Sequence, residues 1–571
     1  MCFLTFVVKA QQGCEIKLLL SDSVADARLF KKLNAYKKVV PYNEVNAQLQ
    51  SVIFQLHESG YLLASIDSTL SSDSLHATAY LTVGNKYTWA ALKTNGIDEE
   101  MIVKSGFRER LYRNKKFSPT QLAKLEERTL QYAENNGYPF AAVFLDSVKI
   151  QENGISARLN LSKNIRVKID SVVIKGGAKI SEKYVCNYIG IKEKDLYKES
   201  SIAAIHNRIQ EIPFLKEIKP FNIVFTPKYT SLILYLDNKK ANQFDGILGF
   251  LPDDVTGKLL ITGQAHLRLL NSFNHGELID VDWRKLQPLS QDITAKFNFP
   301  FILNTPFGND LNFKLYKKDT TFTDVTQNAG IQYLLRGGNY LKVFINNRTV
   351  SLISTKGFEN ITALPSYADV KIISYGLGIK NEKLDYRINP RRGYRINATG
   401  SVGNKNIIKN ARINPVVYDN IQLKSVQYNF LLLSDIFIPI LKKGTVNIGI
   451  KSAALIGATT FENELLRFGG LNTLRGFDEE SLSASIYAIG NVEYRYLFEK
   501  NSNFLLFFNG CYYEKNTVSG HFSDRPYGFG AGLNFQTKPG IFTLTYAVGK
   551  QLNNPILIRS AKIHFGIVSV F

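Results

Sequence analysis

The sequence contains no long hydrophobic run. No stretch of about 18 consecutive apolar residues occurs, so a membrane-spanning helix is not predicted. Apolar residues still make up 45% of the 571 residues, and in the second half of the chain they alternate with polar ones. Such alternation is compatible with a membrane β-barrel, whose signal is weak in each segment. The length predicts several domains.

Motifs for catalysis and for cofactor binding are also missing. The seven histidines are isolated, and we find no nucleophile elbow, no phosphate-binding loop and no pair of metal ligands. The cysteines lack metal-site spacing and lie too far apart for a disulfide framework, so we expect them to be structural and unpaired. We therefore predict a protein that is not an enzyme and that uses no cofactor and no metal. The cysteines are Cys2, Cys14, Cys186 and Cys511.

Dense runs of basic residues are absent, although the net charge is +21. The lysines are scattered along the whole chain and no nucleic-acid-binding motif accompanies them, so nucleic acid is not an expected partner. Lysines and arginines at the rims of a barrel, facing anionic lipid headgroups or lipopolysaccharide, fit this charge better.

The amino terminus has a short apolar run without a preceding basic segment. Residues 2–8 are apolar, and Val8-Lys9-Ala10 follows the small-residue pattern of a signal-peptidase site. We interpret residues 1–12 as the remnant of a secretory signal peptide. A buried first strand is the alternative.

Residues 13–240 contain three copies of one unit with the order strand, helix, helix, strand, strand. Gly60-Tyr61 and Gly137-Tyr138 end the main helix of the first two copies and lie 77 positions apart, and Pro213-Phe214 takes the same place in the third. Ser118 is suited to cap the main helix of the second copy, with Pro119 in the first turn. Each unit is large enough for one sheet covered by two helices. We place the units at 13–87, 88–165 and 166–240.

Three further expectations concern details within these units. In the first copy, the residues between the strand 14–20 and Pro41 read as rich in helix, and Gly60 is expected to supply the positive φ of a helix C-cap. In the third copy, a strand at 167–174 is followed by a helix near 200–212.

Residues 241–571 change to a period of two, which is typical of strands. Ile279, Val281 and Trp283 alternate with acidic and basic residues, for example. Pattern alone does not tell which face points outward. About sixteen segments result, near 243–250, 257–270, 276–287, 291–302, 309–320, 325–336, 340–351, 368–382, 393–403, 421–434, 442–457, 483–498, 501–514, 524–537, 540–551 and 559–571.

The longest gap between these segments, 458–482, carries a glycine-rich motif with one central arginine. The motif residues are Arg467, Gly469, Gly470, Leu474, Arg475, Gly476 and Phe477. Three further stretches accompany it in order, 389–394 (NPRRGY), 490–495 (GNVEYR) and 527–533 (YGFGAGL), and the chain ends on an aromatic residue.

Together these motifs resemble the BamA/TamA superfamily of outer-membrane assembly proteins, and the repeats resemble POTRA domains (polypeptide-transport-associated). The resemblance covers nearly the whole chain, and three units before a barrel match TamA-like members most closely. It implies α+β POTRA repeats followed by an all-β, sixteen-stranded transmembrane barrel. It also implies that the arginine loop folds back into the barrel as a lid, between the eleventh and twelfth strands.

A guanidinium inside a barrel is costly unless it is paired or hydrated, so Arg475 needs a partner. Glu493, on the polar side of the next strand, is the natural candidate, with Arg495 beside it on the same wall. Gly469, Gly470 and Gly476 allow the tight turns that docking requires. An extracellular turn with a solvated arginine is the alternative.

The first and last strands must meet to close the barrel. Gly246 and Gly249 in the first and Gly566 in the last weaken pairing, and the resemblance implies a lateral seam onto which a client strand adds. Ordinary barrel bends are the alternative for these glycines. Ile563, Phe565, Ile567 and Phe571 share one face of the last strand and resemble a C-terminal β-signal, interrupted by Ser569.

The resemblance implies an outer-membrane assembly or translocation factor with its POTRA domains in the periplasm. Its partners would be outer-membrane lipids or lipopolysaccharide, unfolded β-barrel or secreted clients, and a periplasmic or inner-membrane protein bound through the POTRA domains. The first alternative is a two-partner secretion pore for one exoprotein, although such pores usually have two POTRA domains and a plug helix. A passive porin is the second alternative, and it does not explain three tandem soluble domains.

Overall fold

The computed structural model describes residues 13–570 apart from 23–28, 30, 32, 34, 72–74, 96, 253–258, 286–288, 357, 359–360, 362–363, 387–388, 420, 500, 538–539, 553–555 and 557–560. Only the backbone is described for 246–252, 259–263, 336, 540 and 564–570. The predicted signal-peptide remnant and Phe571 lie outside the described residues. None of the described helices has both the length and the apolar character needed to cross a membrane.

The first repeat is a four-stranded sheet in the order β2-β1-β4-β3 with one face covered by α2. Apolar residues of α2 recur at helical spacing and are buried against the sheet, and Gly60 follows the helix with φ +99°, as predicted. The edge strand β2 was missed, because the segment before Pro41 had been expected to be rich in helix. The elements are β1 Gly13–Leu20, β2 Lys37–Pro41, η1 Tyr42–Glu44, α2 Val45–Glu58, β3 Ser65–Ser71 and β4 His76–Thr82.

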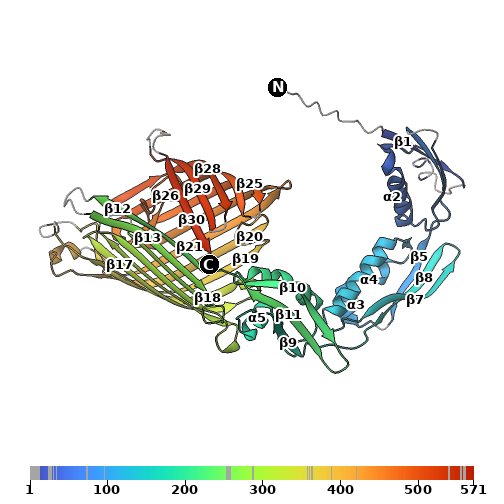
Figure 1. Ribbon diagram of the computed structural model, residues 1–571, viewed down its shortest axis with the longest axis horizontal. Helices are drawn as coiled ribbons and strands as arrows, with labels where there is room; N and C mark the ends of the chain where they lie inside the picture. The colour runs from blue at the N-terminus through green and yellow to red at the C-terminus, as the bar shows by residue number, and fades with distance from the viewer. Residues whose placement is uncertain are drawn as a thin grey trace. The chain divides into compact units, whose positions relative to one another are not determined.

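The second repeat has the same sheet, in the order β6-β5-β8-β7, with α4 lying beside it (Figure 1). Its core contains Trp89, Leu125 and Leu159, all buried. Ser118 caps α4 as predicted, since its hydroxyl accepts a hydrogen bond from Gln121 N at 3.2 Å. The elements are β5 Thr88–Asn95, α3 Glu99–Ser105, η2 Glu109–Leu111, β6 Lys115–Lys116, α4 Pro119–Glu134, β7 Ala142–Gln151 and β8 Gly154–Ser162.

The third repeat has a three-stranded sheet in the order β10-β11-β9 within the described residues. Helix α5 was not predicted, although most of its residues, 184–186, 188 and 189, are buried. The predicted helix near 200–212 is divided into α6 and α7. The elements are β9 Ser171–Lys175, α5 Glu182–Ile189, α6 Glu199–Ala203, α7 Ile205–Glu211, β10 Leu215–Phe225 and β11 Thr230–Asn238.

Each of the three repeats has an equivalent backbone hydrogen bond, which links the residue after its main helix to the residue where the chain leaves the repeat. The carbonyl groups of Gly60, Gly137 and Phe214 accept hydrogen bonds from Tyr87 N, Val167 N and Lys239 N at 2.7, 2.7 and 2.9 Å. The three acceptors are spaced by 77 positions each time. The repeat found in the sequence is therefore a repeat of backbone structure, while the domain boundaries themselves stay predictions.

Polar side chains at the end of the main helix of one repeat cap a helix of the next. Glu58, the last residue of α2, accepts hydrogen bonds from Ser118 Oγ at 2.5 Å and Thr120 N at 2.9 Å, at the start of α4. Asn135, 77 positions later, accepts from Ser200 N at 2.9 Å. Burial of Glu58 opposes ionisation, but the hydrogen bonds from Ser118 and Thr120 outweigh it and lower the pKa of Glu58.

The carboxy-terminal half is a closed antiparallel barrel in which each strand pairs with the next along the chain (Figure 1). This confirms the predicted fold class of α+β repeats followed by a β-barrel. Its strands are β12 Gln243–Pro252, β13 Leu259–Leu270, β14 Leu278–Lys285, β15 Gln291–Phe299, β16 Phe307–Lys318, β17 Phe322–Leu334, β18 Tyr340–Leu352, β19 Asp369–Leu384, β20 Gly393–Ile408, β21 Lys424–Ile440, β22 Gly444–Gly457, β25 Ile486–Glu499, β26 Ser502–Thr517, β27 Gly520–Asp524, β28 Tyr527–Gln536, β29 Gly540–Lys550 and β30 Lys562–Val570.

The described barrel has seventeen strand segments but sixteen strand positions. Both β27 and β28 pair with β26, and Tyr513 opposite Asp524 and Gly510 opposite Tyr527 belong to one register. The break falls at Pro526, which has no backbone N–H to donate to the ladder. The two segments therefore form one interrupted strand, and the predicted number of sixteen agrees with the structure.

Large apolar side chains cover the outer face of the barrel. Along β19, Ile373, Tyr375 and Leu377 are exposed while the polar Ser374 between them is buried. An apolar exterior around a polar interior is the arrangement of a barrel that spans a membrane. The remaining elements are short: η3 Ile302–Asn304, η4 Arg336–Gly338, η5 Pro415–Tyr418, η6 Glu462–Glu464, β23 Leu466–Phe468 and β24 Leu482–Ala484.

The cap at Glu58 gives a first prediction. Glu58→Ala should lower the protection of the first-turn amides of α4 about 5-fold at pH 7, because an N-terminal cap contributes about 1 kcal/mol. The folded-state pKa of Glu58 is depressed, so the stabilising contribution is present above the unfolded pKa and is lost as the pH falls through the folded pKa. Hydrogen–deuterium exchange on the full chain, at pH 7 and below pH ~4, measures both effects.

The matched control is Asn135→Ala, which removes an amide that does not titrate from the equivalent position. It should weaken the protection around Ser200 equally at both pH values. Equal loss of protection at both pH values in Glu58→Ala as well would contradict the role of the carboxylate.

Candidate functional site

The loop between β22 and β25 forms a hairpin, β23 with β24, inside the barrel. Phe468 of β23 stacks on Tyr487 with ring centroids 4.7 Å apart and meets Tyr513 edge-on at 5.4 Å. Both tyrosines belong to barrel strands, and Leu474 at the tip of the loop is completely buried in the same cluster. Apolar packing thus holds the loop against β25 and β26.

Glycine is required where the loop turns against the wall. Gly469, Gly470 and Gly476 have φ values of +116°, +94° and +94°, a region that other residues rarely adopt. A Cβ atom on Gly476 would lie 2.6 Å from Gly549 N of β29. The wall also has a glycine at this contact. A Cβ atom on Gly528 would lie 1.9 Å from the Arg475 carbonyl oxygen, so only glycine leaves room for the loop.

All three nitrogens of the Arg475 guanidinium donate hydrogen bonds to the barrel wall. The guanidinium donates to Glu493 Oε2 at 2.6 Å, to Asn509 Oδ1 at 2.9 Å and to Asn491 Oδ1 at 2.5 Å. It also lies over the Phe507 ring, 3.6 Å from the centroid. Arg475 is 9% exposed and Glu493 5%, so this charge pair is buried, and every contact comes from β25 or β26. In this structure Arg475 is thus a buried and paired arginine rather than a solvated one.

Glu493 binds a second arginine on its other oxygen. Arg495 Nε donates to Glu493 Oε1 at 2.6 Å, and Arg495 Nη1 donates to Asn389 Oδ1 at 3.2 Å. Asn389 belongs to the NPRRGY motif, which precedes β20. The structure thus brings three of the sequence motifs together around one buried carboxylate.

Arg467 and Phe477, the remaining motif residues, fix the two limbs of the loop. The Arg467 guanidinium lies 3.3 Å from the centroid of the Tyr316 ring on β16, and its Nε donates to Glu480 at 3.2 Å. Phe477 is partly buried beside the apolar cluster of the loop. The roles of the motif residues stay predictions.

A second buried ion pair at the base of the loop was missed in the sequence. Lys405 of β20 contacts the Glu464 carboxylate, and neither side chain is exposed. Glu464 also accepts from Gln427 Nε2 at 3.2 Å and Phe461 N at 3.0 Å, while Arg348 donates to its carbonyl oxygen at 3.1 Å. A signal for this pair was available in the strand alternation. Lys405 shares the inward face of its strand with the buried Ile407, and a lysine on that face needs a partner.

The barrel closes between β12 and β30 over a short stretch. The register of these strands consists of Gln243 opposite Val570 and Phe244 opposite Ser569 among the described residues. Elsewhere the ladders are long, and β19 with β20, for example, pairs continuously from Asp369 to Leu384.

The glycines predicted to lie at this seam are all in the two strands but are bonded to their inner neighbours. Gly246 and Gly249 lie opposite Ala265 and Thr262 of β13, and Gly566 lies opposite Thr543 of β29. The three glycines therefore lie outside the residue pairs that join β12 to β30. The predicted C-terminal signal residues Ile563, Phe565 and Ile567 are in β30, and Ile563 is exposed on its outer face; Phe571 lies outside the described residues.

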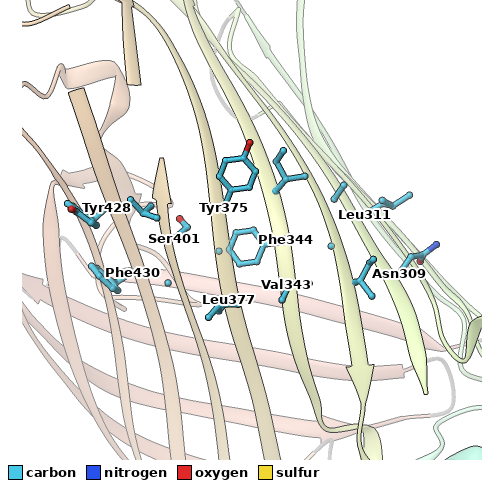
Figure 2. Close-up of a pocket in the computed structure, with 16 residues that line it drawn as sticks. Asn309, Leu311, Val343, Phe344, Tyr375, Leu377, Ser401, Tyr428 and Phe430 are labelled. Atoms are coloured by element: carbon cyan, nitrogen blue, oxygen red, sulfur yellow. The ribbon is translucent and has the colours of Figure 1, made fainter. Parts of the chain in front are cut away.

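A large hollow lies on the lipid-facing wall, away from the loop. This groove of about 1000 Å³ follows β16–β21 (Figure 2). Gly330 and Gly376 lie opposite Phe344, and the Phe344 ring occupies the place that a Cβ atom on Gly376 would take. The lining of the groove is mostly apolar, which fits contact with lipid. Among the described residues, no cluster of three potential metal ligands occurs.

Residues 366–571 match the Omp85 superfamily domain, the superfamily that includes BamA, and this confirms the predicted resemblance for that part of the chain. No curated protein has a matching sequence. Solved structures with a similar fold include CdiB from Escherichia coli, at 12% identity and a TM-score of 0.56, and CdiB from Acinetobacter baumannii, at 12% identity and a TM-score of 0.52. Each alignment covers 93% of this chain and 97% of the other. BamA from Haemophilus ducreyi lacking POTRA domains 1–3 aligns at 13% identity over 85% of this chain and all of its own, with a TM-score of 0.43.

The anchoring of the loop by Arg475 can be tested directly. Arg475→Ala leaves the buried Glu493 with one arginine instead of two and should destabilise the folded barrel by about 3 kcal/mol. Trypsin should then cleave the loop of the purified protein faster, and the folded form in gel electrophoresis should be lost at a lower temperature.

Arg412→Ala, which changes an exposed arginine outside the barrel strands, is the matched control and should leave both measurements unchanged. Wild-type values in Arg475→Ala would show that the contacts with Glu493, Asn491 and Asn509 do not hold the loop.

Proposed function

We propose that this protein is an outer-membrane factor that inserts or exports β-rich client proteins through the lateral seam of its barrel. The single observation that carries the proposal is the asymmetry of the barrel wall. Neighbouring strands such as β19 with β20 and β20 with β21 pair over long ladders, whereas the register of β12 on β30 contains two pairs in the part of the chain that the structure describes. A seam of this kind exposes unpaired N–H and C=O groups, and a client strand adds to such an edge by β-augmentation.

The buried loop explains why the protein would not act as an open pore. The loop occupies the lumen and is held by charge pairs at Arg475 and at Glu464. Client strands are therefore directed to the wall. There they form hydrogen bonds with backbone groups of the seam that are otherwise unpaired. The energy comes from client folding and from transfer of apolar surface into lipid, and no nucleotide is needed.

The amino-terminal repeats supply the receiving part of the mechanism. In this proposal they lie in the periplasm and bind clients or a partner protein, also through the edges of their sheets. Strands β3 and β7 are edge strands of the first two described sheets and carry exposed side chains along their length. Rims rich in lysine and arginine meet anionic headgroups or lipopolysaccharide, which suits the net charge of +21.

The proposal predicts that a covalently closed seam is inactive. Phe244→Cys combined with Ser569→Cys places two cysteines at directly opposite positions, so oxidation should form a disulfide across the seam. Insertion of an unfolded β-barrel client into proteoliposomes, followed by gel mobility, should fall to the level of protein-free liposomes and should recover after reduction.

The matched control is Tyr375→Cys with Val402→Cys, an opposed pair on the closed wall between β19 and β20, where a disulfide should have no effect. Undiminished insertion by the locked seam variant would refute the seam mechanism. A secretion pore for one exoprotein is distinguished by depletion in cells, because it predicts loss of one secreted protein and unchanged levels of other outer-membrane barrels.

A further inference from the structure

The returning limb of the luminal loop contains three consecutive acidic residues, Asp478, Glu479 and Glu480. Two of them contact barrel strands that lie on opposite sides of the seam. Asp478 receives Lys562 Nζ at 2.8 Å on Oδ1 and at 2.9 Å on Oδ2. Glu480 Oε1 accepts a hydrogen bond from Arg284 Nη2 at 3.0 Å.

Lys562 is the first residue of β30, at the end opposite to the paired residues Ser569 and Val570. It lies across from Ala547, which is completely buried, whereas Ile563 is exposed on the outer face, so Lys562 belongs to the inner face. Asp478 thus reaches the carboxy-terminal side of the seam from within the barrel.

Arg284 lies on β14, two strands from the seam on its amino-terminal side. It is opposite Gln264 of β13, which in turn is opposite Ile247 of β12. This row is beyond the part of β12 that pairs with β30. Glu480 therefore reaches the other side of the seam at a level where the register between β12 and β30 has already ended.

The backbone at Glu480 supports a specific role for its side chain. Its φ is +53°, in the left-handed region that a residue with a Cβ atom rarely adopts. Such a conformation persists only where the surroundings hold it. Here Arg284 and Arg467 bind the two carboxylate oxygens, at 3.0 and 3.2 Å.

The tip of the loop is fixed on the carboxy-terminal side of the barrel, whereas Arg467 on the first limb lies on Tyr316 of β16. Gly476 lies against Gly549 of β29 and Arg475 against β25 and β26. The contact of Glu480 with β14 therefore joins that side to the amino-terminal strands across the lumen.

From this placement we infer that Asp478 and Glu480 are positioning residues that hold the seam closed from inside: the loop joins β30 to β14 where the two edge strands do not pair. The inference rests on the proposed function, in which the seam is the working site. Opening requires the loss of at least one of the two ion pairs, so movement of the loop and opening of the seam are one coupled event.

Hydrogen–deuterium exchange on the full-length protein in detergent micelles tests this inference. Asp478→Lys places two positive charges together and should raise exchange of β12 and β30 amides about 3-fold, the effect expected for a largely exposed pair. Combining it with Lys562→Asp recreates the pair with reversed charges and should restore wild-type protection. Exchange in β19–β21 should stay unchanged throughout.

The matched pair of variants is Glu480→Gln and Glu479→Gln. Glu480→Gln should raise exchange in β12 and β30 about 10-fold, because two partly buried arginines lose their shared partner. The Glu479 carboxylate accepts a hydrogen bond from Leu471 N within the loop, at 2.7 Å, so Glu479→Gln should leave the seam as in the wild type.

Salt supplies an independent readout. Raising the ionic strength from 0.05 to 0.5 M should increase seam exchange in the wild-type protein, and it should have little further effect in Asp478→Lys. Unchanged exchange in Asp478→Lys and Glu480→Gln would overturn the inference, as would an increase spread evenly over the whole barrel. No client is present in this experiment, so its failure is separate from failure of client insertion by the seam.

Discussion

The buried carboxylate of Glu493 is the interaction on which the luminal arrangement depends. A charge inside the barrel is stable only with partners, and here two arginines from different segments share one side chain. Arg475 brings the loop to the wall, and Arg495 links the wall to the segment before β20 through Asn389. The close approach is possible because the loop and the wall both have glycine at the contact, at Gly476 and Gly528. The loop is therefore part of the barrel structure rather than an external appendage.

Strong anchoring of the loop contrasts with weak closure of the wall. Most of the wall consists of long ladders, in which every added pair increases the cost of separation, whereas β12 and β30 meet at Phe244 and its neighbour. A barrel without edges is resistant to pairing with other chains. A barrel with a short seam still has unpaired strand edges to which another strand can bind. The proposed function and the inferred ionic contacts of Asp478 and Glu480 both depend on this difference.

Much of the fold could be predicted because its signals are local. Alternation with a period of two located the barrel strands within a few residues, and Ser118 with Pro119 marked the start of α4. Signals of other kinds were overlooked. Strand β2 is short and lies at a sheet edge, and the interruption at Pro526 divides a strand whose register continues on both sides.

The candidate site was predictable only in part, because its contacts are made by residues far apart in the sequence. The motif indicated Arg475, and strand parity indicated Glu493. Lys405 and Glu464 are 59 positions apart, and nothing in the sequence around either residue points to the other. The short register at the seam depends on how the first and last strands meet when the barrel closes, which no local pattern in the sequence reports. The glycines expected to mark the seam pair instead with β13 and β29.

The most direct test of the account is an experimental structure of the full-length protein in lipid nanodiscs. The account predicts density for the loop inside the lumen, with the Arg475 guanidinium against Glu493, and a β12–β30 ladder that ends within a few residues of Phe244. A loop outside the barrel, or a β12–β30 ladder as long as that between β19 and β20, would contradict it.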